Sequence, residues 1–417
     1  MTGPGVDRIA VIGASLAGLS AAETLRAEGY GGTITLVGAE DQLPYDRPPL
    51  SKQVLTGERE PDSTALRTNE RYDELDLDLR LGTHASALDP AAHEVTLDGA
   101  TDAAGGTVLA YDRLIIATGA SPRTLPGTPP LDGIYTLRTI DDCIALRRKF
   151  EVGARVVVVG AGFIGAEVAS SARARGLDVT VLEAAPVPLE RAVGGEMGRV
   201  CAALHTVHGV DLRLGTGVEG FDGTQRVERV RLADGSTLAA DVVVVGVGVA
   251  PNVGWLDGSG IAINNGITCD ATLATSAPDV YAAGDVANWL NPLFSERMRA
   301  EHWTNAVEQG RAAALNMLAG SKDASPFSSV PYFWSDQYET KIQFVGHARP
   351  DDDVRVVHGS VDDDTPSDGR FVALYGRGGR LVAAIGFNWA RHVMAYRAMI
   401  GEGIGWNDAL AHAASVE

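Results

Sequence analysis

The hydrophobic residues near the N-terminus come in short runs that alternate with a longer mixed stretch. One run, Arg8–Gly13, ends in glycine, and the stretch Leu16–Ala27 follows it before a second run, Thr33–Val37. Short apolar runs bounded by turn residues are typical of buried parallel strands, and the longer stretch between them has helical character. The N-terminal segment therefore predicts a β-α-β unit.

The same pattern returns in the middle of the chain. A strand is predicted over Arg155–Gly160, a helix over Gly165–Arg175 and a strand over Asp178–Glu183. Two such units predict an α/β fold with two Rossmann-like dinucleotide-binding domains of duplicated architecture.

Later segments predict how these domains are connected. The runs Leu114–Gly119 and Asp241–Gly248 each have the character of a last strand leading to a neighbouring domain. The run Asp279–Asp285 and a helix over Thr304–Leu318 then follow. We expect a split first domain (1–116 and 246–325) with the second domain (117–245) inserted into it.

The C-terminal part, 326–417, predicts a third, α+β domain. Its expected elements are strands at Lys341–Val345 and Val354–Val357, a hairpin of Phe371–Tyr375 and Leu381–Ile385, and a helix over Trp389–Ile400. The turn Arg377–Arg380 contains two glycines, which is typical of a tight hairpin.

The middle unit contains a complete GxGxxG motif, made of Gly160, Gly162 and Gly165. The first glycine allows the turn, the second admits a pyrophosphate close to the backbone, and the third packs the helix against the strand. Phe163 and Ile164 complete the loop, where the backbone N–H groups of the helix start can bind phosphate.

The N-terminal copy of this motif is imperfect. Gly13 and Gly18 are present, but Ser15 replaces the middle glycine, and Leu16 and Ala17 follow it. A small hydroxyl side chain is compatible with a pyrophosphate and can donate a hydrogen bond to it. Glu40, near the end of the next strand, is either a ribose ligand or a surface carboxylate.

Glu183 indicates which nicotinamide cofactor is preferred. It lies 23 residues after Gly160, at the end of the second strand of its unit. A carboxylate there accepts hydrogen bonds from the ribose hydroxyls and repels a 2′-phosphate. NADH is therefore favoured over NADPH, although Arg191 lies close enough in sequence to keep a phosphate contact open.

Composition narrows the class of protein and its partners. The chain has 417 residues and a formal net charge of −19, which argues against nucleic acid as a partner. No apolar run is long enough for a membrane span. The three cysteines, Cys143, Cys201 and Cys269, form no CxxC pair, so we expect free thiols in the reducing cytoplasm, and no metal site.

Several further motifs together carry a resemblance to a known family. They are Arg47–Lys52, Ala117–Gly119, Gly246–Gly248, Gly284–Asp285, Glu301–Trp303 and Phe333–Asp336. With the two glycine motifs, this order resembles the ferredoxin reductases of bacterial oxygenase systems, to which rubredoxin reductase and apoptosis-inducing factor are related. The resemblance covers nearly the whole chain and implies a glutathione-reductase-like architecture.

The resemblance also implies cofactors and roles. FAD is expected in the split domain and NADH in the inserted one. Lys52 is expected beside the flavin and paired with Glu167, although an ordinary interdomain salt bridge is the alternative. The other FAD contacts that it implies involve Arg47, Asp285, Trp303 and Trp334. Ala117, Thr118, Gly119, Gly246, Val247, Gly248, Gly284 and His302 are also expected to bind a cofactor, without an assignment to FAD or to NADH. Phe163 either covers the nicotinamide site or packs in the core.

The cysteine pattern predicts where the electrons go next. The segment that carries a redox-active cysteine in related disulfide and peroxide reductases, 41–52, has no sulfur, so a thiolate relay is excluded. A flavin can release electrons singly, and the resemblance implies a [2Fe–2S] ferredoxin as acceptor. Rubredoxin reduction, NADH oxidase activity or an NADH-sensing role like that of apoptosis-inducing factor remain alternatives. The basic residues expected to attract an acidic ferredoxin are Arg297, Arg299, Arg311, Lys341, Arg349, Arg377 and Arg380.

Overall fold

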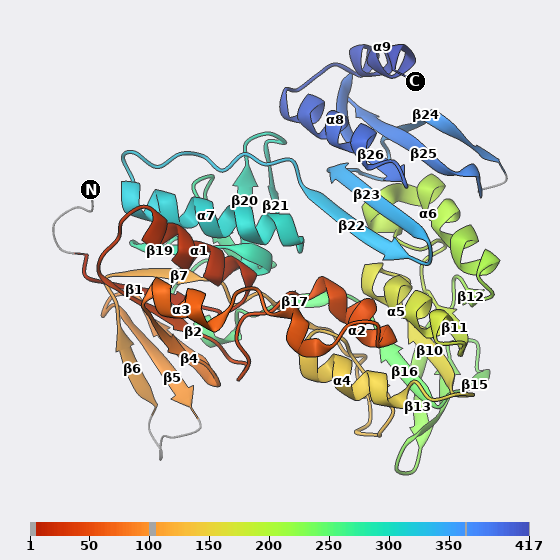
Figure 1. Ribbon diagram of the computed structural model, residues 1–417, viewed down its shortest axis with the longest axis horizontal. Helices are drawn as coiled ribbons and strands as arrows, with labels where there is room; N and C mark the ends of the chain where they lie inside the picture. The colour runs from red at the N-terminus through yellow and green to blue at the C-terminus, as the bar shows by residue number, and fades with distance from the viewer. Residues whose placement is uncertain (1–5, 100–105, 363–364, 417) are drawn as a thin grey trace. The chain divides into compact units, whose positions relative to one another are not determined.

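The computed structural model describes residues 6–99, 106–362 and 365–416 (Figure 1). The chain forms two compact units. Unit 1 comprises Met1–Asp46, Ala65–Ser121 and Ala250–Pro331, and unit 2 comprises Arg47–Thr64, Pro122–Val249 and Tyr332–Glu417. The chain passes from one unit to the other after Asp46, Thr64 and Pro331, and also within the strands β8 (Ala120–Pro122) and β17 (Val249–Pro251).

Unit 1 is built on a parallel sheet of five strands in the order β19-β7-β1-β2-β3. These strands are β1 (Arg8–Ile12), β2 (Thr33–Val37), β3 (Leu77–Arg80), β7 (Arg113–Ile116) and β19 (Val280–Ala282). Helices α1 (Leu16–Ala27) and α7 (Trp303–Ala319) lie side by side. The remaining elements are α3 (Asn69–Leu75), β4 (Thr83–Asp89), β5 (Glu94–Gly99), β6 (Thr107–Ala110), β18 (Ile267–Cys269), β20 (Ala287–Asn291) and β21 (Glu296–Met298).

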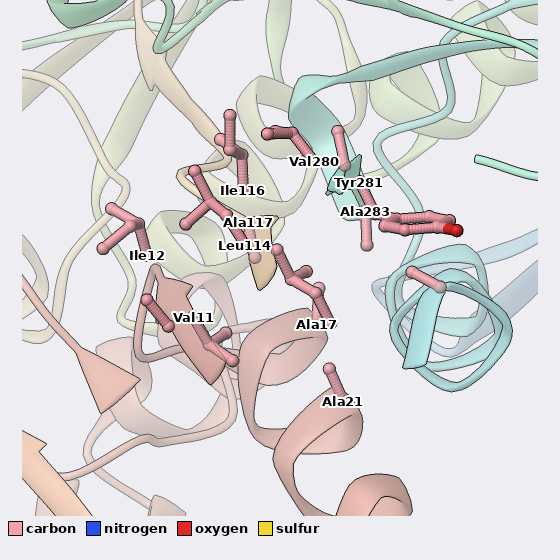
Figure 2. Packing of buried hydrophobic residues seen from close by; sticks show 14 of the residues in the cluster. Val11, Ile12, Ala17, Ala21, Leu114, Ile116, Ala117, Val280, Tyr281 and Ala283 are labelled. Atoms are coloured by element: carbon pink, nitrogen blue, oxygen red, sulfur yellow. The ribbon is translucent and has the colours of Figure 1, made fainter. Parts of the chain in front are cut away.

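The core of unit 1 explains why its strands are nearly all apolar. Figure 2 shows side chains of β1, β7 and β19 meeting Ala17 and Ala21 of α1. Both faces of a parallel sheet are covered, so its strands carry continuous apolar runs instead of an alternating pattern. The small residues Ala17 and Ala21 let the helix approach the sheet closely.

Unit 2 repeats this arrangement. Its parallel sheet has the order β12-β11-β10-β16-β9. The strands are β9 (Ile134–Tyr135), β10 (Arg155–Val159), β11 (Asp178–Leu182), β12 (Asp211–Arg213) and β16 (Val242–Val245). Its other elements up to Val249 are α2 (Gln53–Thr56), α4 (Ile140–Lys149), α5 (Phe163–Ala174), α6 (Glu190–Val207), β13 (Val218–Gly223), β14 (Val227–Leu232) and β15 (Thr237–Ala239).

The C-terminal part of unit 2 is an antiparallel sheet in the order β22-β23-β26-β25-β24. Its elements are β22 (Tyr332–Gln337), β23 (Thr340–Gly346), β24 (Asp353–Asp362), β25 (Thr365–Arg377), β26 (Arg380–Phe387), α8 (Ala390–Gly401) and α9 (Trp406–Ser415). The predicted hairpin turn is present: Arg377 pairs with Arg380, and Gly378 and Gly379 both have positive φ.

The predicted division into three domains stays a prediction. The compact units group residues by contacts, and they place the C-terminal sheet together with the inserted segment. They also place Arg47–Thr64, which the sequence alone assigned to the first domain, in unit 2.

Candidate functional site

The glycine loop of unit 2 connects β10 to α5, and each glycine has a steric reason. Gly160 has φ +99°, and a Cβ there would collide with the carbonyl oxygen of Gly246. A Cβ on Gly165 would collide with the carbonyl oxygen of Gly160. At Gly162 a Cβ would lie 3.9 Å from its nearest described neighbour, so the middle of the loop is open. An open middle position above a helix N-terminus suits a pyrophosphate.

The loop of unit 1, between β1 and α1, has the same geometry. A Cβ on Gly13 would collide with the carbonyl oxygen of Ala117, and one on Gly18 with that of Gly13. Ser15 occupies the position that corresponds to Gly162, and its side chain makes no capping hydrogen bond to α1. Because the corresponding position in unit 2 is open, the serine that replaces the middle glycine is sterically acceptable. Leu16 is half-buried and Ala17 is buried.

Glu183 is held by the glycine loop itself. One carboxylate oxygen accepts a hydrogen bond from the backbone N–H of Ala161 at 2.7 Å, and the other accepts one from Ala185 at 2.8 Å. The side chain is therefore fixed at the end of β11, next to the open middle of the loop. Arg191 is exposed on the first turn of α6.

Glu40 does not occupy the position in unit 1 that corresponds to Glu183. The backbone N–H of Glu183 bonds to Arg213 on the next strand, and in unit 1 the corresponding bond to Arg80 is made by Gly38. Glu40 lies two residues further on and accepts a hydrogen bond from the hydroxyl of Tyr45 at 2.5 Å. Its ribose role stays a prediction.

Each glycine loop is contacted by the loop that follows the neighbouring strand, which is β7 in unit 1 and β16 in unit 2. Thr118 and Asn252 exchange side chain–backbone hydrogen bonds at 2.9 and 2.8 Å, and Gly119 has φ +67°. In unit 2, the backbone N–H of Gly246 bonds to Val159. Val247 is half-buried and Gly248, with φ +95°, is exposed. These predicted site residues thus lie at the carboxyl ends of parallel strands, where ligands of α/β sheets bind.

The last strand of the unit 1 sheet leads to another group of predicted residues. Gly284 has φ +78°, and its N–H donates to the side chain of Gln309 on α7. Asp285 is half-buried and its carbonyl oxygen accepts a hydrogen bond from Arg299 at 3.2 Å. These residues join the end of β19 to the N-terminal end of α7.

His302 and Trp303 form that N-terminal end. Desolvation by burial lowers the pKa of His302 to about 4, so the imidazole is neutral at physiological pH. Trp303 is 37% exposed, and its indole N–H donates to Asp46 at 2.8 Å. This hydrogen bond helps to fix the orientation of the indole ring.

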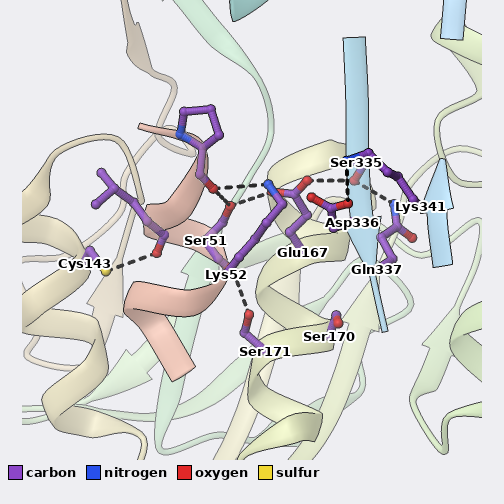
Figure 3. A network of polar contacts seen from close by, with 12 residues as sticks. Ser51, Lys52, Cys143, Glu167, Ser170, Ser171, Ser335, Asp336, Gln337 and Lys341 are labelled. Carbon is purple, nitrogen blue, oxygen red and sulfur yellow. Dashed lines mark hydrogen bonds and ion pairs between the residues drawn. The ribbon is translucent and has the colours of Figure 1, made fainter. Parts of the chain in front are cut away.

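Lys52 and Glu167 form an ion pair within unit 2 (Figure 3). Their side chains are 10% and 3% exposed, and Lys52 Nζ lies 2.7 Å from Glu167 Oε2. Ser51 donates to the same oxygen at 2.5 Å, and Ser335 donates to Oε1 at 2.8 Å. The predicted pair is therefore present, and Glu167 is held by three donors.

Ser51 and Ser335 were not expected at the site. Both lie inside motifs that carry the resemblance, Arg47–Lys52 and Phe333–Asp336, but sequence alone assigns no partner to a serine. Arg47, from the first of these motifs, donates to the backbone carbonyl of Arg138 at 2.8 Å.

The aromatic residues of unit 2 differ in their surroundings. Phe163 packs against Phe333 with ring centroids 4.4 Å apart, and its role as a cover for the nicotinamide stays a prediction. Ile164 is 44% exposed in the loop. Trp334 is half-buried on the opposite face of β22 from Phe333 and stacks on Tyr332, with ring centroids 5.9 Å apart.

The three cysteine thiols are buried and protonated at neutral pH. Burial raises the pKa of Cys143, Cys201 and Cys269 to about 12 each, so none is a thiolate at neutral pH. Within the described ranges, no group of three or more His, Cys, Asp or Glu residues is arranged to hold a metal ion. No helix in the part of the chain that the structure describes is long and apolar enough to cross a membrane.

Not all of the expected docking residues are equally accessible. Arg299 is 10% exposed and pairs with Glu301, and Arg377 is 22% exposed beside a fully buried carboxylate of Asp352. These two arginines pair with carboxylates of the protein itself, so they are poor candidates for contact with a partner. Arg297, Arg311, Lys341, Arg349 and Arg380 are exposed.

Comparison with known proteins identifies the class. Residues 7–310 match the family described as pyridine nucleotide-disulphide oxidoreductase, and residues 332–417 match the family described as reductase C-terminal. The chain therefore belongs to the pyridine nucleotide-disulphide oxidoreductases, which are oxidoreductases that use a flavin and NAD(H). The fold class and the family predicted from the sequence are confirmed.

Its relatives narrow the family to ferredoxin–NAD(+) reductases of oxygenase systems. The chain is 39% identical to rhodocoxin reductase of Rhodococcus erythropolis, over 94% of this chain and 89% of that protein. It is 38% identical to the ferredoxin–NAD(+) reductase component of the biphenyl dioxygenase system of Paraburkholderia xenovorans, over 95% and 93%. The structure of the covalent putidaredoxin reductase–putidaredoxin complex matches with a TM-score of 0.90 and 33% identity over 99% of both chains.

Proposed function

We propose that this chain uses FAD to take reducing equivalents from NADH and passes electrons singly to a [2Fe–2S] ferredoxin that serves an oxygenase. The observation that carries the proposal is the duplicated loop between strand and helix. Both copies are closed at the first and last glycines, and the middle of the complete copy is open. FAD accepts a hydride from NADH and can release its electrons one at a time.

The loop of unit 1 is proposed to bind the pyrophosphate of FAD. Gly13, Ser15 and Gly18 present the N-terminus of α1. Asp285 and Trp303 are proposed to contact other parts of the same cofactor, together with Arg47. Trp334 is proposed to lie near the flavin ring.

The loop of unit 2 is proposed to bind NADH. Glu183 accepts two backbone hydrogen bonds, so its carboxylate is held ready for ribose hydroxyls and repels a 2′-phosphate. Lys52, held by Glu167, is proposed to place its ammonium group beside the flavin. The buried thiols leave no sulfur relay, so an external one-electron carrier is the proposed acceptor.

We also propose that a ferredoxin is the electron acceptor and that the protein works in the cytoplasm. Two of the relatives are named as ferredoxin–NAD(+) reductase components of dioxygenase systems. An acidic ferredoxin would meet a chain of net charge −19, so its docking needs a local basic surface.

The test is an anaerobic titration of the purified flavoprotein. Stoichiometric NADH should bleach the visible flavin band, and an oxidised [2Fe–2S] ferredoxin should then restore it. Rubredoxin and oxygen are supplied to the same preparation as competing acceptors. Flavin that stays oxidised with NADH would refute the proposal, and preferential reduction of rubredoxin or oxygen would refute the ferredoxin.

A long-lived reduced flavin–NAD⁺ complex with slow turnover on every acceptor would instead indicate an NADH-sensing protein. Extraction of the cofactor and its chromatography separate FAD from FMN.

A further inference from the structure

Helix α5 and strand β22 contact each other in three layers along unit 2. Phe163 packs on Phe333, with centroids 4.4 Å apart. One turn along the helix, Glu167 accepts a hydrogen bond from Ser335. The last layer joins Ser170 Oγ to the backbone N–H of Tyr338 at 2.7 Å. The middle layer places a carboxylate where an apolar pair could pack.

The strand supplies a second buried polar residue behind that carboxylate. Ser335 and Gln337 are both fully buried, on the same face of β22 as Phe333. Gln337 Nε2 donates to Ser335 Oγ at 3.2 Å. Because the serine oxygen accepts from Gln337, its single proton is directed at Glu167 Oε1.

The two carboxylate oxygens of Glu167 accept hydrogen bonds from different donors. Oε2 accepts from Ser51 and Lys52, and Oε1 accepts from Ser335 (Figure 3). A buried carboxylate oxygen without a donor is unfavourable, so without Ser335 the carboxylate would rotate to share its other donors. That rotation would move Oε2 away from Lys52 Nζ.

We propose that Ser335, supported by Gln337, is a positioning residue that holds Glu167 and thereby keeps the Lys52 ammonium in one orientation. The C-terminal sheet then takes part in flavin reduction through a hydrogen-bonded chain of Gln337, Ser335, Glu167 and Lys52. This inference rests on the proposed function, in which Lys52 lies beside the flavin.

The test compares Ser335→Ala with Ser335→Thr, which keeps the hydroxyl, in the flavin-loaded enzyme. Ser335→Ala should lower the limiting rate of flavin reduction about tenfold, because small misplacements of a reacting geometry are costly. The dissociation constant for NADH should stay within about twofold, since the glycine loop is untouched. Ser335→Thr should recover most of the rate.

The matched control is Ser170→Ala, which removes the neighbouring contact between α5 and the end of β22 without touching Glu167. It should change thermal stability and leave the limiting rate unchanged. In a Lys52→Ala background, Ser335→Ala should cause no further loss of rate, because the group it positions is gone.

The midpoint potential of the bound flavin gives a readout apart from turnover. A cation held beside a flavin favours its reduced, anionic form, so Ser335→Ala and Lys52→Ala should both lower the potential, and Ser170→Ala should not. If Ser335→Ala does not retain flavin, Gln337→Met carries the same prediction with a smaller effect.

Two outcomes overturn the inference in distinguishable ways. If Lys52→Ala impairs reduction but Ser335→Ala or Gln337→Met keeps the wild-type rate and potential, Ser335 has no positioning role and the proposed function stands. If Lys52→Ala itself leaves rate and potential unchanged, the role of Lys52 in the proposed function fails, and that of Ser335 with it.

Discussion

At the scale of a residue, the Glu183 carboxylate has both a structural role and a proposed role in cofactor binding. Its two oxygens bind the backbone at Ala161 and Ala185, so the carboxylate shapes the loop at which it is proposed to meet the ribose. A change at this position therefore affects both the choice of cofactor and the loop.

We expect the pair of substitutions Glu183→Ala and Ala184→Arg to move cofactor preference toward NADPH. Removing a repulsive carboxylate and adding a charge-assisted bond should be worth about 1.5–3 kcal/mol in the ratio of kcat/KM values. Steady-state kinetics with both cofactors measure it, with Ala184→Arg alone as the control. Equal efficiency of the wild type with NADH and NADPH would contradict the argument.

Lys52 is the second residue for which the structure gives a specific expectation. Lys52→Ala should slow the limiting rate of flavin reduction more than it weakens NADH binding, as stopped-flow measurements would show. It also leaves Glu167 buried without its cation, which should destabilise the protein by about 3–5 kcal/mol.

The double variant Lys52→Met with Glu167→Gln separates these effects. It removes both charges, so it should recover thermal stability but not the rate. An unchanged limiting rate in Lys52→Ala would return the pair to a structural ion pair.

At the scale of an element, the glycines at the start of α5 differ in how much space surrounds them. A Cβ on Gly165 would collide with the carbonyl oxygen of Gly160, whereas one on Gly162 would lie 3.9 Å from its nearest described neighbour. The same contrast appears at the start of α1, where Ser15 replaces the open glycine.

Gly165→Ala should therefore push α5 away from β10, cost about 1–3 kcal/mol of stability and weaken NADH binding. Gly162→Ser, which copies the loop of unit 1, should keep the melting temperature close to that of wild type. Thermal unfolding of the two variants side by side makes the comparison. Equal destabilisation by both changes would show that the loop is not shaped as described.

The C-terminal end of α6 carries a histidine that should make stability depend on pH. His205 is fully buried and hydrogen-bonded to the Tyr338 hydroxyl at 2.7 Å, with His208 nearby. Burial, and to a lesser extent the positive charge that His208 can carry, lowers the pKa of His205 to about 4.

Because the unfolded chain binds this proton near pH 6.5 and the folded one only near pH 4, stability is lost as the pH falls through that window. His205→Asn should be less stable than wild type at pH 7. The difference in unfolding free energy between the two proteins should be smaller at pH 5 than at pH 7 by about 2 kcal/mol. Their melting temperatures should be correspondingly closer at pH 5. A difference that stays constant from pH 7 to pH 5 would contradict the buried neutral histidine.

At the scale of the whole molecule, partner recognition has to work against the net charge. The chain carries −19, so attraction of an acidic ferredoxin requires local basic residues. Arg299 and Arg377 are engaged within the fold, and Arg297 donates to two backbone carbonyls, which leaves exposed residues such as Arg311, Lys341 and Arg380 as candidates.

Charge reversal among these exposed residues should lower the association rate with ferredoxin several-fold and flatten its salt dependence. Steering of this kind is screened over about 10 Å at 0.1 M salt. Reduction of a small dye by NADH should be unaffected, and Arg229→Glu, an exposed change on β14, serves as control. Parallel loss of dye and ferredoxin reduction would show that the residues act on the flavin site instead.

The sequence by itself determined the two β-α-β units, their glycine loops and the positions of Glu183 and the hairpin turn at Gly378. These features depend on local rules: strand and helix periodicity, and glycines where the backbone has positive φ or makes close contact. The bounds shifted only slightly, as for α5, which starts at Phe163 instead of Gly165.

Only the tertiary structure decided which distant residues meet. Ser335 reaches Glu167 across 168 positions of sequence, and Arg47–Thr64 joins unit 2. The register of β2 against β3 puts Gly38, and not Glu40, at the position that corresponds to Glu183. Such contacts follow from how whole elements pack, because a serine or a glutamate has no pattern of its own that names its partner.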